Sequence, residues 1–370
     1  MRLSLAAMAL GATLLAGHGA FAAGARWDGA DDLPVNPLPC DGGAGTVVSK
    51  AYDGGKAVNA PNMAGKPITL VDVPKLIGIG YFNATSQGMQ EAAKELGNVK
   101  VTTDGPTEAK IDEQIKFIDN YITRGVNGVL FAANDPVAIA PVLKKALSKG
   151  IHVVGYDANS TPDAREWFVN QAEFNGIAKS MIDNMAKEMG ENKSFAIVTS
   201  TFTTPNQARW IAEMWAYAGK CHAKMKWLET VEAQEDNILS FNQASTLINK
   251  YGDQLSGLFG MTSVATPASA EAVTRAKLCG KIAVVGLATP NAMKPYVKTD
   301  CVKSVVLWNP VNLGYAAVYV TRAVVDGKLK PGDTSVEAGK LGKLMVVNGS
   351  EILLGSPFTY TKENIDQFNF

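Results

Sequence analysis

The sequence predicts an α/β fold of two doubly wound lobes, each built on a parallel sheet. Short apolar runs recur along the chain, separated by segments long enough for a helix. Such runs are typical of strands covered on both faces, and alternating strands and helices imply right-handed crossovers. About four strand-helix units end at Asp157 and about four lie between residues 194 and 308, which favours two similar lobes over one long sheet. The runs are LIGIGYF, VNGVLFAA, IHVVGYD, FAIVTS, GLFGM, IAVVGLA and VKSVVLW.

Residues 1–22 have the pattern of a secretory signal peptide. Arg2 precedes an uncharged apolar run that ends in small residues, with AFA at positions 20 to 22. We expect cleavage after Ala22 and export of the mature protein. A membrane anchor is the alternative, but the run is shorter than the roughly 20 residues that a bilayer span needs. Residues 23–67 are rich in Gly, Asp, Pro and Ala without periodicity, and predict an extended arm.

Two of the expected helices show a clear apolar stripe. Ile111, Ile115, Ile118 and Ile122 follow the spacing i, i+4, i+7, i+11 and predict a helix that ends at Gly125. Ile177, Met181, Met185 and Met189 predict a second helix that ends at Gly190. A methionine stripe can form an adaptable binding face, but this spacing favours a helix packed on the core.

The charges and the cysteines limit the possible binding partners and the possible cellular compartment. Without the signal, 34 basic and 35 acidic residues remain, a balance that attracts neither nucleic acid nor anionic lipid. Four cysteines can pair in an oxidising compartment, and none has the C-x-x-C spacing of a zinc or thioredoxin-type site. Cys279 and Cys301 flank the run IAVVGLA and the segment TPNAMKPYVKTD, so we favour that pair; Cys40 and Cys221 remain.

The sequence lacks the common motifs of catalysis and of cofactor binding. The sequence has no G-x-S-x-G, no H-E-x-x-H and no phosphate-loop motif, and its three histidines, His18, His152 and His222, lie far apart. GIGYFN at residues 78–83 imitates a dinucleotide fingerprint. However, Asn83 replaces the third glycine, and Tyr81 and Phe82 would crowd the turn that a pyrophosphate approaches. We therefore expect no enzyme activity, no cofactor and no metal.

Polar and aromatic side chains gather instead after the expected strands, at the edge where open α/β sheets place their ligands. Carboxylates and amides can bond ligand hydroxyls, and aromatic faces cover C–H surface. Helix capping is the alternative for Asn134, Asp135 and Asn159, less so for Asp157, which has no clear helix start after it. The residues are Tyr81, Phe82, Asn83, Asn134, Asp135, Asp157, Asn159, Thr203, Thr204, Asn206, Gln207, Thr262, Ser263, Trp308 and Asn309.

Long blocks of residues 68–370 resemble the type I periplasmic solute-binding proteins of ABC importers, in the branch of autoinducer-2 receptors and rhamnose-binding proteins. The blocks include PKLIGIGYF, VVGYDANSTPDAREWFVNQ, GLATPNAMKPYVKTDCVKSVVLWN and the ending TKENIDQFNF. The resemblance implies two lobes joined by three hinge crossovers. The expected first lobe comprises residues 68–171 and about 309–340, and the second comprises residues 172–308 and about 341–370.

The resemblance also assigns binding residues. The branch's binding lysine and first-lobe aspartate fall on Lys75 and Asp157, and its second-lobe glutamine falls on Gln207. The acid beside that glutamine is replaced by Asn206, and two backbone-contact positions fall on Met261 and Ser263. Because an amide both donates and accepts, Asn206 favours a polyol or sugar different from the branch's furanosyl ligand. A surface lysine is the alternative for Lys75.

The function that follows is capture of a small polyhydroxylated solute by hinge closure in the periplasm, because a ligand that contacts both lobes favours the closed state. An ABC permease and its ATPase would be the partners, and we expect a monomer. The alternatives are an autoinducer-2-type signal receptor and a subunit that presents ligand to a membrane sensor.

Overall fold

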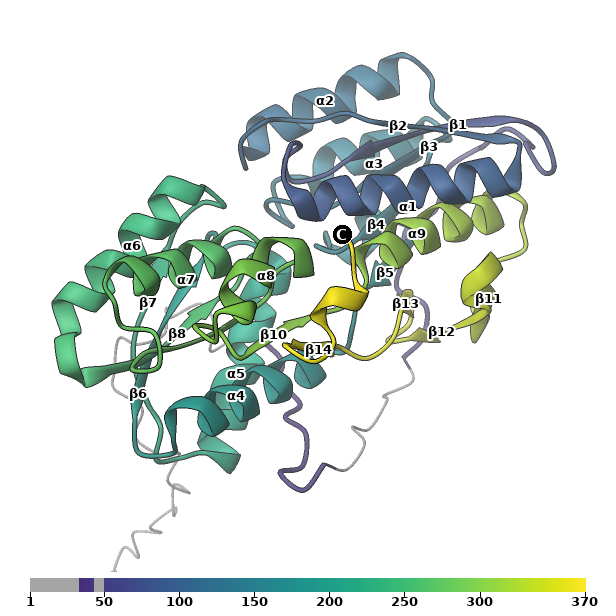
Figure 1. Cartoon of the computed structure of the whole chain (residues 1–370). Helices are drawn as coiled ribbons and strands as arrows, with labels where there is room; N and C mark the ends of the chain where they lie inside the picture. The colour runs from purple at the N-terminus through teal and green to yellow at the C-terminus, as the bar shows by residue number, and fades with distance from the viewer. Residues whose placement is uncertain (1–32, 43–49) are drawn as a thin grey trace, which may run out of the picture.

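The computed structural model describes residues 33–42 and 50–370; the expected signal peptide lies outside them. The described chain forms two α/β lobes side by side (Figure 1). The first lobe contains β1 (Ile68–Val73), α1 (Gly80–Leu96), β2 (Val99–Thr103), α2 (Ile111–Thr123), β3 (Gly128–Phe131), α3 (Ala140–Ser148), β4 (His152–Tyr156), β5 (Trp167–Asn170), α9 (Pro310–Val325), β11 (Ser335–Glu337), β12 (Lys343–Val347) and β13 (Glu351–Leu353). The second contains α4 (Phe174–Met189), β6 (Ser194–Thr199), α5 (Pro205–Cys221), β7 (Lys226–Glu232), α6 (Asn237–Tyr251), β8 (Leu255–Gly260), α7 (Ala265–Arg275), β9 (Ala283–Gly286), α8 (Pro290–Lys298), β10 (Ser304–Leu307) and β14 (Phe358–Thr361). Short 3-10 helices lie at Pro162–Ala164, Gly252–Gln254, Gly339–Leu341 and Ile365–Gln367.

The larger sheet has the order β11-β12-β13-β5-β4-β3-β1-β2, and the smaller has the order β7-β6-β8-β9. Strands β1 to β5 and β6 to β9 pair in parallel, as predicted. Antiparallel pairs extend the larger sheet, where β11 pairs with β12 and β12 with β13, while β10 and β14 form a separate two-stranded antiparallel sheet. The two-lobed α/β fold class is thus confirmed, with an antiparallel edge on the first sheet.

Within residues 50–370 the chain passes between the lobes three times: after β5, after β10 and after β13. The last passage corrects the expected division near residue 341. Because Ile352 on β13 pairs in parallel with Val169 on β5, the chain stays in the first lobe as far as Leu353.

The first strand also lies earlier than predicted. The run LIGIGYF is not a strand: β1 ends at Val73, and Tyr81 and Phe82 lie in the first turn of α1. Pro74 has no N–H to offer a sheet, and Gly78 has φ 91°, a conformation that leaves the strand. This shift places the two rings at the start of a helix, directly after a loop that carries Lys75.

The helix stripes pack as predicted. In α2, Ile118 and Ile122 are buried, and in α4 Met181 and Met185 are fully buried. A Cβ placed on Gly257 of β8 would lie 2.5 Å from Met185 Sδ, so the methionine stripe fits closely against the sheet. The interpretation of this stripe as core is confirmed.

Helices α1 and α9 approach each other very closely on one face of the larger sheet. A Cβ at Gly88 would lie 1.8 Å from the carbonyl oxygen of Val311, and one at Gly314 would lie 1.9 Å from that of Thr85. Only glycine permits this approach, which fixes the helix that carries Tyr81 against the helix that follows the second passage.

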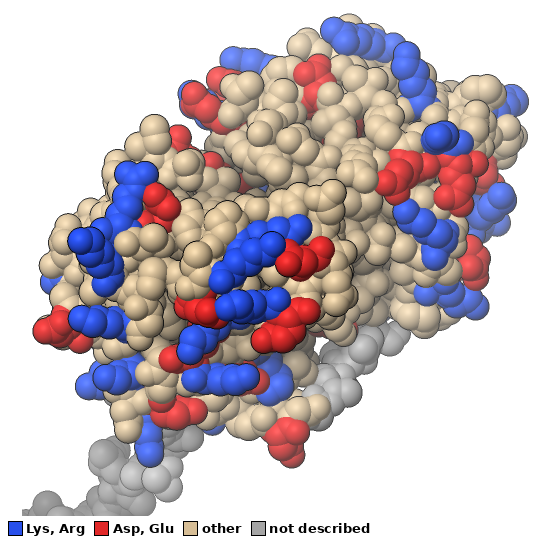
Figure 2. All heavy atoms as spheres, in the orientation of Figure 1, with Lys and Arg blue, Asp and Glu red and all other residues tan. Residues whose placement is uncertain are grey.

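Two disulfides are present. Cys279 bonds to Cys301, the pair favoured from the sequence, and Cys40 bonds to Cys221, with Cα separations of 4.6 and 5.5 Å. No helix in the described ranges has the length and apolar character that a membrane crossing requires. Lys and Arg side chains are interspersed with Asp and Glu over the face shown in Figure 2.

A buried acid in the first lobe predicts an unusual pH dependence. Asp72 on β1 is fully buried, accepts hydrogen bonds from Tyr156 and Thr103 at 2.8 and 3.0 Å, and burial raises its pKa to about 7. Unfolded Asp titrates near 4, so between about pH 4 and 7 the folded state binds a proton that the unfolded state has released. This stabilisation is complete below about pH 4 and is lost as the pH rises through about 7.

We therefore expect Asp72→Asn to flatten the fall in melting temperature between pH 4 and 7, measured by circular dichroism. Parallel curves for the variant and the wild type would contradict this assignment.

Candidate functional site

A small cavity of about 30 Å³ lies between the lobes. Both lobes contribute its walls, at the carboxyl ends of their parallel strands. Its residues are Lys75, Tyr81, Phe82, Asp157, Asn206, Gln207, Trp210, Glu235, Met261, Thr262, Ser263, Leu287, Leu307 and Trp308.

Lys75 lies at the centre of the polar wall. Its Nζ is 2.8 Å from Glu235 Oε1 and 3.5 Å from Asp157 Oδ2, and its side chain is 6% exposed. Burial acts to lower the pKa of Lys75, but the charges of Glu235 and Asp157 outweigh it and raise the pKa above its usual value. Lys75 therefore remains charged at neutral pH, and the surface alternative is excluded by its burial.

The backbone of Lys75 is held by a buried amide network. Gln114 of α2 donates to the carbonyl oxygens of Pro74 and Ala132 at 3.0 and 2.7 Å, and accepts from Asn134 N at 3.1 Å. Asn134 in turn donates through Nδ2 to Lys75 O at 2.8 Å. Asn134 is thus a positioning residue behind the site, which neither the capping nor the ligand interpretation had assigned.

Asp157 turns out of β4 in the left-handed conformation, with φ 57°, which Asp tolerates better than most residues. Its Oδ1 accepts from Tyr81 OH at 2.9 Å. Its Oδ2 is buried, lies 3.5 Å from Lys75 Nζ as an ion pair, and receives no hydrogen bond from the described residues. Burial raises the pKa of Asp157, against the charge of Lys75 and the hydrogen bond from Tyr81.

Aromatic rings form the adjoining wall. Trp308 Nε1 donates to Tyr81 OH at 2.9 Å, so Trp308, Tyr81 and Asp157 form one chain of hydrogen bonds. Tyr81 packs edge-on to Phe82 and Trp308, with centroids 5.1 and 6.0 Å apart, and Trp210 lies 5.6 Å from Trp308. Burial and the Asp157 charge hold the pKa of Tyr81 well above its usual value, so its hydroxyl keeps its proton.

The second lobe supplies amides and one acid. Gln207 Oε1 accepts from Thr199 Oγ1 and Ser200 N at 2.6 and 2.8 Å, and its Nε2 lies 3.3 Å from Glu235 Oε1. Asn206 Oδ1 accepts from Gln207 N at 2.9 Å, which leaves its amide nitrogen as the donor for the cavity.

Most of the residues expected at the site line the cavity: Lys75, Tyr81, Phe82, Asp157, Asn206, Gln207, Met261, Ser263 and Trp308. Asn309 does not; its side chain accepts from Asn312 N at 3.1 Å and caps α9. Capping or turn contacts also hold Asp135, which accepts from Val137 N and Ala138 N, and Asn159, which accepts from Ser160 N and Arg165.

Thr262, expected at the strand ends, also lines the cavity, and four lining residues were missed: Trp210, Glu235, Leu287 and Leu307. Trp210 follows Gln207 by three positions on α5, which is the spacing of one helix face and could have revealed it. Glu235 follows β7, whose sequence KWLETVE alternates and is not an apolar run. Thr262 itself accepts from Val264 N and Ala265 N at 3.2 and 2.8 Å.

The donor set suits a neutral organic ligand better than a metal, because a lysine ammonium separates the two carboxylates. No group of three or more His, Cys, Asp or Glu residues in the described part of the chain could hold a metal ion. Two lobes around a cavity with polar and aromatic walls are typical of a solute-binding protein.

Comparison with known proteins supports this assignment to the solute-binding proteins. Residues 71–329 match the family model of the periplasmic binding protein domain. The chain belongs to this family, in its type I form, whose characterised relatives are solute-binding proteins and not enzymes.

Similar proteins bind sugars or AI-2. The D-ribose/D-allose-binding protein of Pseudomonas aeruginosa is 28% identical over 236 residues, 61% of this chain and 72% of its own. An ABC transporter solute-binding protein from Clostridium phytofermentas with bound L-rhamnose is 26% identical, with a TM-score of 0.77 over 82% of this chain and 98% of that one. LsrB from Clostridium saccharobutylicum in complex with AI-2 has a TM-score of 0.77 at 22% identity over 82% and 100% of the two chains, which shows a shared fold.

Proposed function

We propose that this protein captures a small hydroxylated sugar or polyol between its lobes in the periplasm and delivers it to an ABC importer. The observation that carries the proposal is Asp157 Oδ2, a buried acceptor at the cavity wall that makes no hydrogen bond and whose ion-pair partner, Lys75 Nζ, lies 3.5 Å away. A buried acceptor without a hydrogen bond costs about 1 to 3 kcal/mol, and a ligand hydroxyl would supply the missing bond.

The remaining wall fits the same chemistry. Asn206 and Gln207 can donate to ligand hydroxyls through their amide nitrogens, and the rings of Phe82, Trp210 and Trp308 can cover the C–H face of a sugar. Because the ligand would contact both lobes, it stabilises the closed arrangement, and the permease would recognise that shape. The sugars bound by the relatives support the ligand class, and their periplasmic location supports the compartment. A monomer, and the absence of a nucleic-acid partner, stay predictions.

The test is a thermal-shift panel on the purified mature protein, with D-ribose, D-allose, L-rhamnose, D-arabinose, D-fucose and AI-2. A ligand that binds only the folded protein raises its melting temperature. Mass spectrometry of molecules that co-purify extends the panel. If neither measurement finds a small molecule, the proposed function is wrong.

A further inference from the structure

Glu235 joins the two lobes across the cavity. It follows β7 of the second lobe with φ 54°, and its side chain is 3% exposed. Its Oε1 contacts Lys75 Nζ at 2.8 Å, and Lys75 belongs to the first lobe. The contact is therefore an ion pair between the two lobes, and separation of the lobes would break it.

The charges around the cavity are unbalanced. Lys75 is the sole cationic side chain among the lining residues, and it faces the carboxylates of both Asp157 and Glu235. One excess negative charge at this wall repels an anionic ligand, and because the three side chains are at most 6% exposed the repulsion is poorly screened by solvent. Hydroxyl groups, in contrast, can donate to either carboxylate.

We infer that Glu235 determines ligand specificity. It accepts hydrogen bonds from the ligand on the second-lobe side of the cavity and so selects neutral hydroxylated ligands over sugar acids. Its contact with Lys75 also stabilises the closed arrangement of the lobes. This inference rests on the proposed function and narrows its ligand class. It also accounts for Asn206, because the second lobe keeps one carboxylate at the site, supplied by the loop after β7 and not by α5.

The test compares Glu235→Gln with wild type and with Asp253→Asn, a control that removes an exposed acid of the same lobe. The probes are the neutral sugars L-rhamnose, D-ribose and D-fucose, and D-galacturonate, which has the ring of D-fucose with a carboxylate at the last carbon. Calorimetry measures their affinities. Loss of one charge-assisted hydrogen bond should weaken the neutral sugars about ten-fold or more in Glu235→Gln and narrow their advantage over D-galacturonate.

Equal affinity of the wild type for D-galacturonate and the neutral sugars would overturn the inference, as would unchanged sugar affinity in Glu235→Gln.

The Lys75–Glu235 contact is tested without ligand, by the distance between spin labels on non-canonical side chains in place of Val137 and Ile238. These residues are 69% and 71% exposed and lie on different lobes. Glu235→Gln should shift the distances towards the open form; an unshifted distribution refutes the contact even if no probe sugar binds and the proposed function fails.

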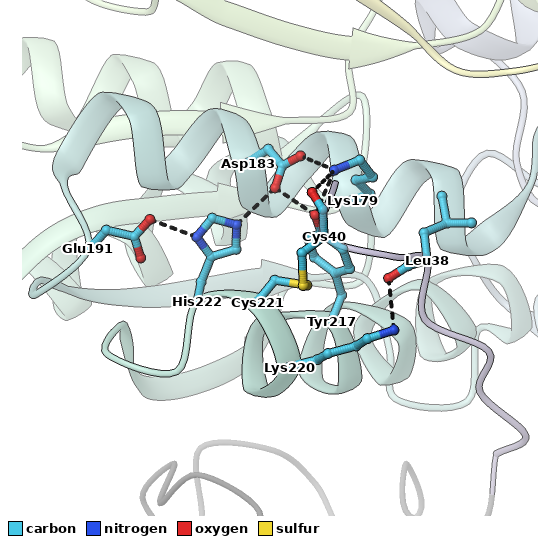
Figure 3. Close-up of a disulfide and its surroundings, with 9 residues drawn as sticks. All are labelled: Leu38, Cys40, Lys179, Asp183, Glu191, Tyr217, Lys220, Cys221 and His222. Atoms are coloured by element: carbon cyan, nitrogen blue, oxygen red, sulfur yellow. Dashed lines mark hydrogen bonds and ion pairs between the residues drawn. A yellow bond between two sulfur atoms is a disulfide. The ribbon is translucent and has the colours of Figure 1, made fainter. Parts of the chain in front are cut away.

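The arm before β1 contacts both lobes, and this is an independent observation. In the second lobe, Asn36 N donates to both carboxylate oxygens of Glu213 at 3.0 Å, and Asn175 donates to Asn36 O at 2.9 Å. Cys40 is bonded to Cys221 at the end of α5, beside Lys179, whose Nζ lies 3.4 Å from Cys40 O (Figure 3). Residues 33–42 are therefore fixed covalently to this lobe.

Residues 50–58 lie on the first lobe. Tyr52 OH donates to Glu166 O at 2.9 Å, and its ring packs on Trp167 at 5.1 Å. Gly55 N donates to Arg165 O, and Val58 N donates to Leu147 O, each at 2.8 Å. A Cβ at Gly54 would lie 2.3 Å from Glu166 O, so the arm backbone rests directly on the start of β5.

The geometry points to the arm as a fourth connection between the lobes, locked by the Cys40–Cys221 disulfide, that restricts the hinge. The family match begins only at residue 71, so the arm lies outside the shared domain. The two anchors, Cys40 and Tyr52, are twelve peptide units apart in the chain, which limits their separation to about 43 Å. Lobe movements that need a longer separation are blocked while both anchors hold.

The chain offers a matched control, because the Cys279–Cys301 disulfide lies within the second lobe. In ligand-free protein with the labels described above, we expect C40S/C221S to broaden the distribution of lobe distances, and C279S/C301S to leave it at the wild-type width. The same width in all three proteins would overturn the inference. If C40S/C221S does not fold, cleavage at a protease site engineered between residues 43 and 49 tests the same connection. An unchanged width of the lobe-distance distribution after cleavage would also overturn the inference.

Discussion

Asp157→Ala is expected to abolish binding of the sugar that the panel identifies. The substitution removes the buried acceptor that faces the cavity and breaks the chain of hydrogen bonds from Trp308 through Tyr81. A lost hydrogen bond to a charged group costs about 1.5 to 3 kcal/mol, and a Lys75 left with one carboxylate adds to the cost. Together these effects should lower affinity at least a hundred-fold, as measured by calorimetry.

Two further variants separate binding from folding at this position. Alanine at φ 57° is strained, whereas asparagine tolerates the left-handed conformation and keeps the shape of the side chain. Asp157→Asn should therefore keep the wild-type melting temperature and still bind more weakly. Asp135→Ala removes another strand-end acid of the same lobe, one that caps backbone N–H groups outside the cavity, and should keep full affinity. Unchanged affinity in Asp157→Ala would remove this residue from the site.

Much of the fold follows from local patterns. The strands that are apolar on both faces, such as β3 and β8, and the helix stripes of α2 and α4 depend on burial alone, which periodicity reports. The position of β1 was wrong because ITLVDV and LIGIGYF are both apolar. What ends the strand is Pro74 and the left-handed Gly78, a matter of backbone geometry.

The pairing of β12 and β13 with the first sheet could not be predicted, because it joins segments about 180 residues apart in the chain through tertiary contacts.

Some residues of the candidate site could likewise be predicted from the sequence, and others could not. Asp157, Gln207 and Trp308 follow buried strands, so strand recognition alone places them at the ligand edge. Glu235 follows a half-exposed edge strand and escapes that rule. Asn309 has the same position and residue type as a ligand contact, yet its side chain caps α9. The direction in which a side chain points after a strand is set by the next helix, and sequence spacing does not reveal it.

Lys75→Met is expected to prevent binding at neutral pH. The change leaves two buried carboxylates, Asp157 and Glu235, without the ammonium that lies 2.8 Å from one and 3.5 Å from the other. Removing one partner of a buried ion pair typically costs about 3 to 5 kcal/mol. A two-lobed protein can relieve this cost by opening, which returns both acids to water, so we expect the closed state to lose population while each lobe stays folded.

The pH dependence of Lys75→Met has a definite sign. Burial already raises the pKa of Asp157, and loss of the opposing Lys75 charge should raise it further. The closed state then binds more protons than the open one, so it gains stability as the pH falls and loses it as the pH rises through the raised pKa. Sugar affinity of Lys75→Met, measured by calorimetry from pH 5 to 8, should recover towards acid pH. In the wild type Lys75 stays protonated over this range, so its affinity should vary less.

The double variant Lys75→Met/Glu235→Gln tests whether charge is the cause. It returns the net charge of the three groups from two negative charges to one, the wild-type value, without restoring the Lys75 contact. If unpaired charge holds the lobes apart, the double variant should close more readily at neutral pH than Lys75→Met alone, as seen in the lobe distances. If the two variants are equally open, repulsion between Asp157 and Glu235 is not what opens the protein, and Lys75 acts through its direct contacts with the ligand.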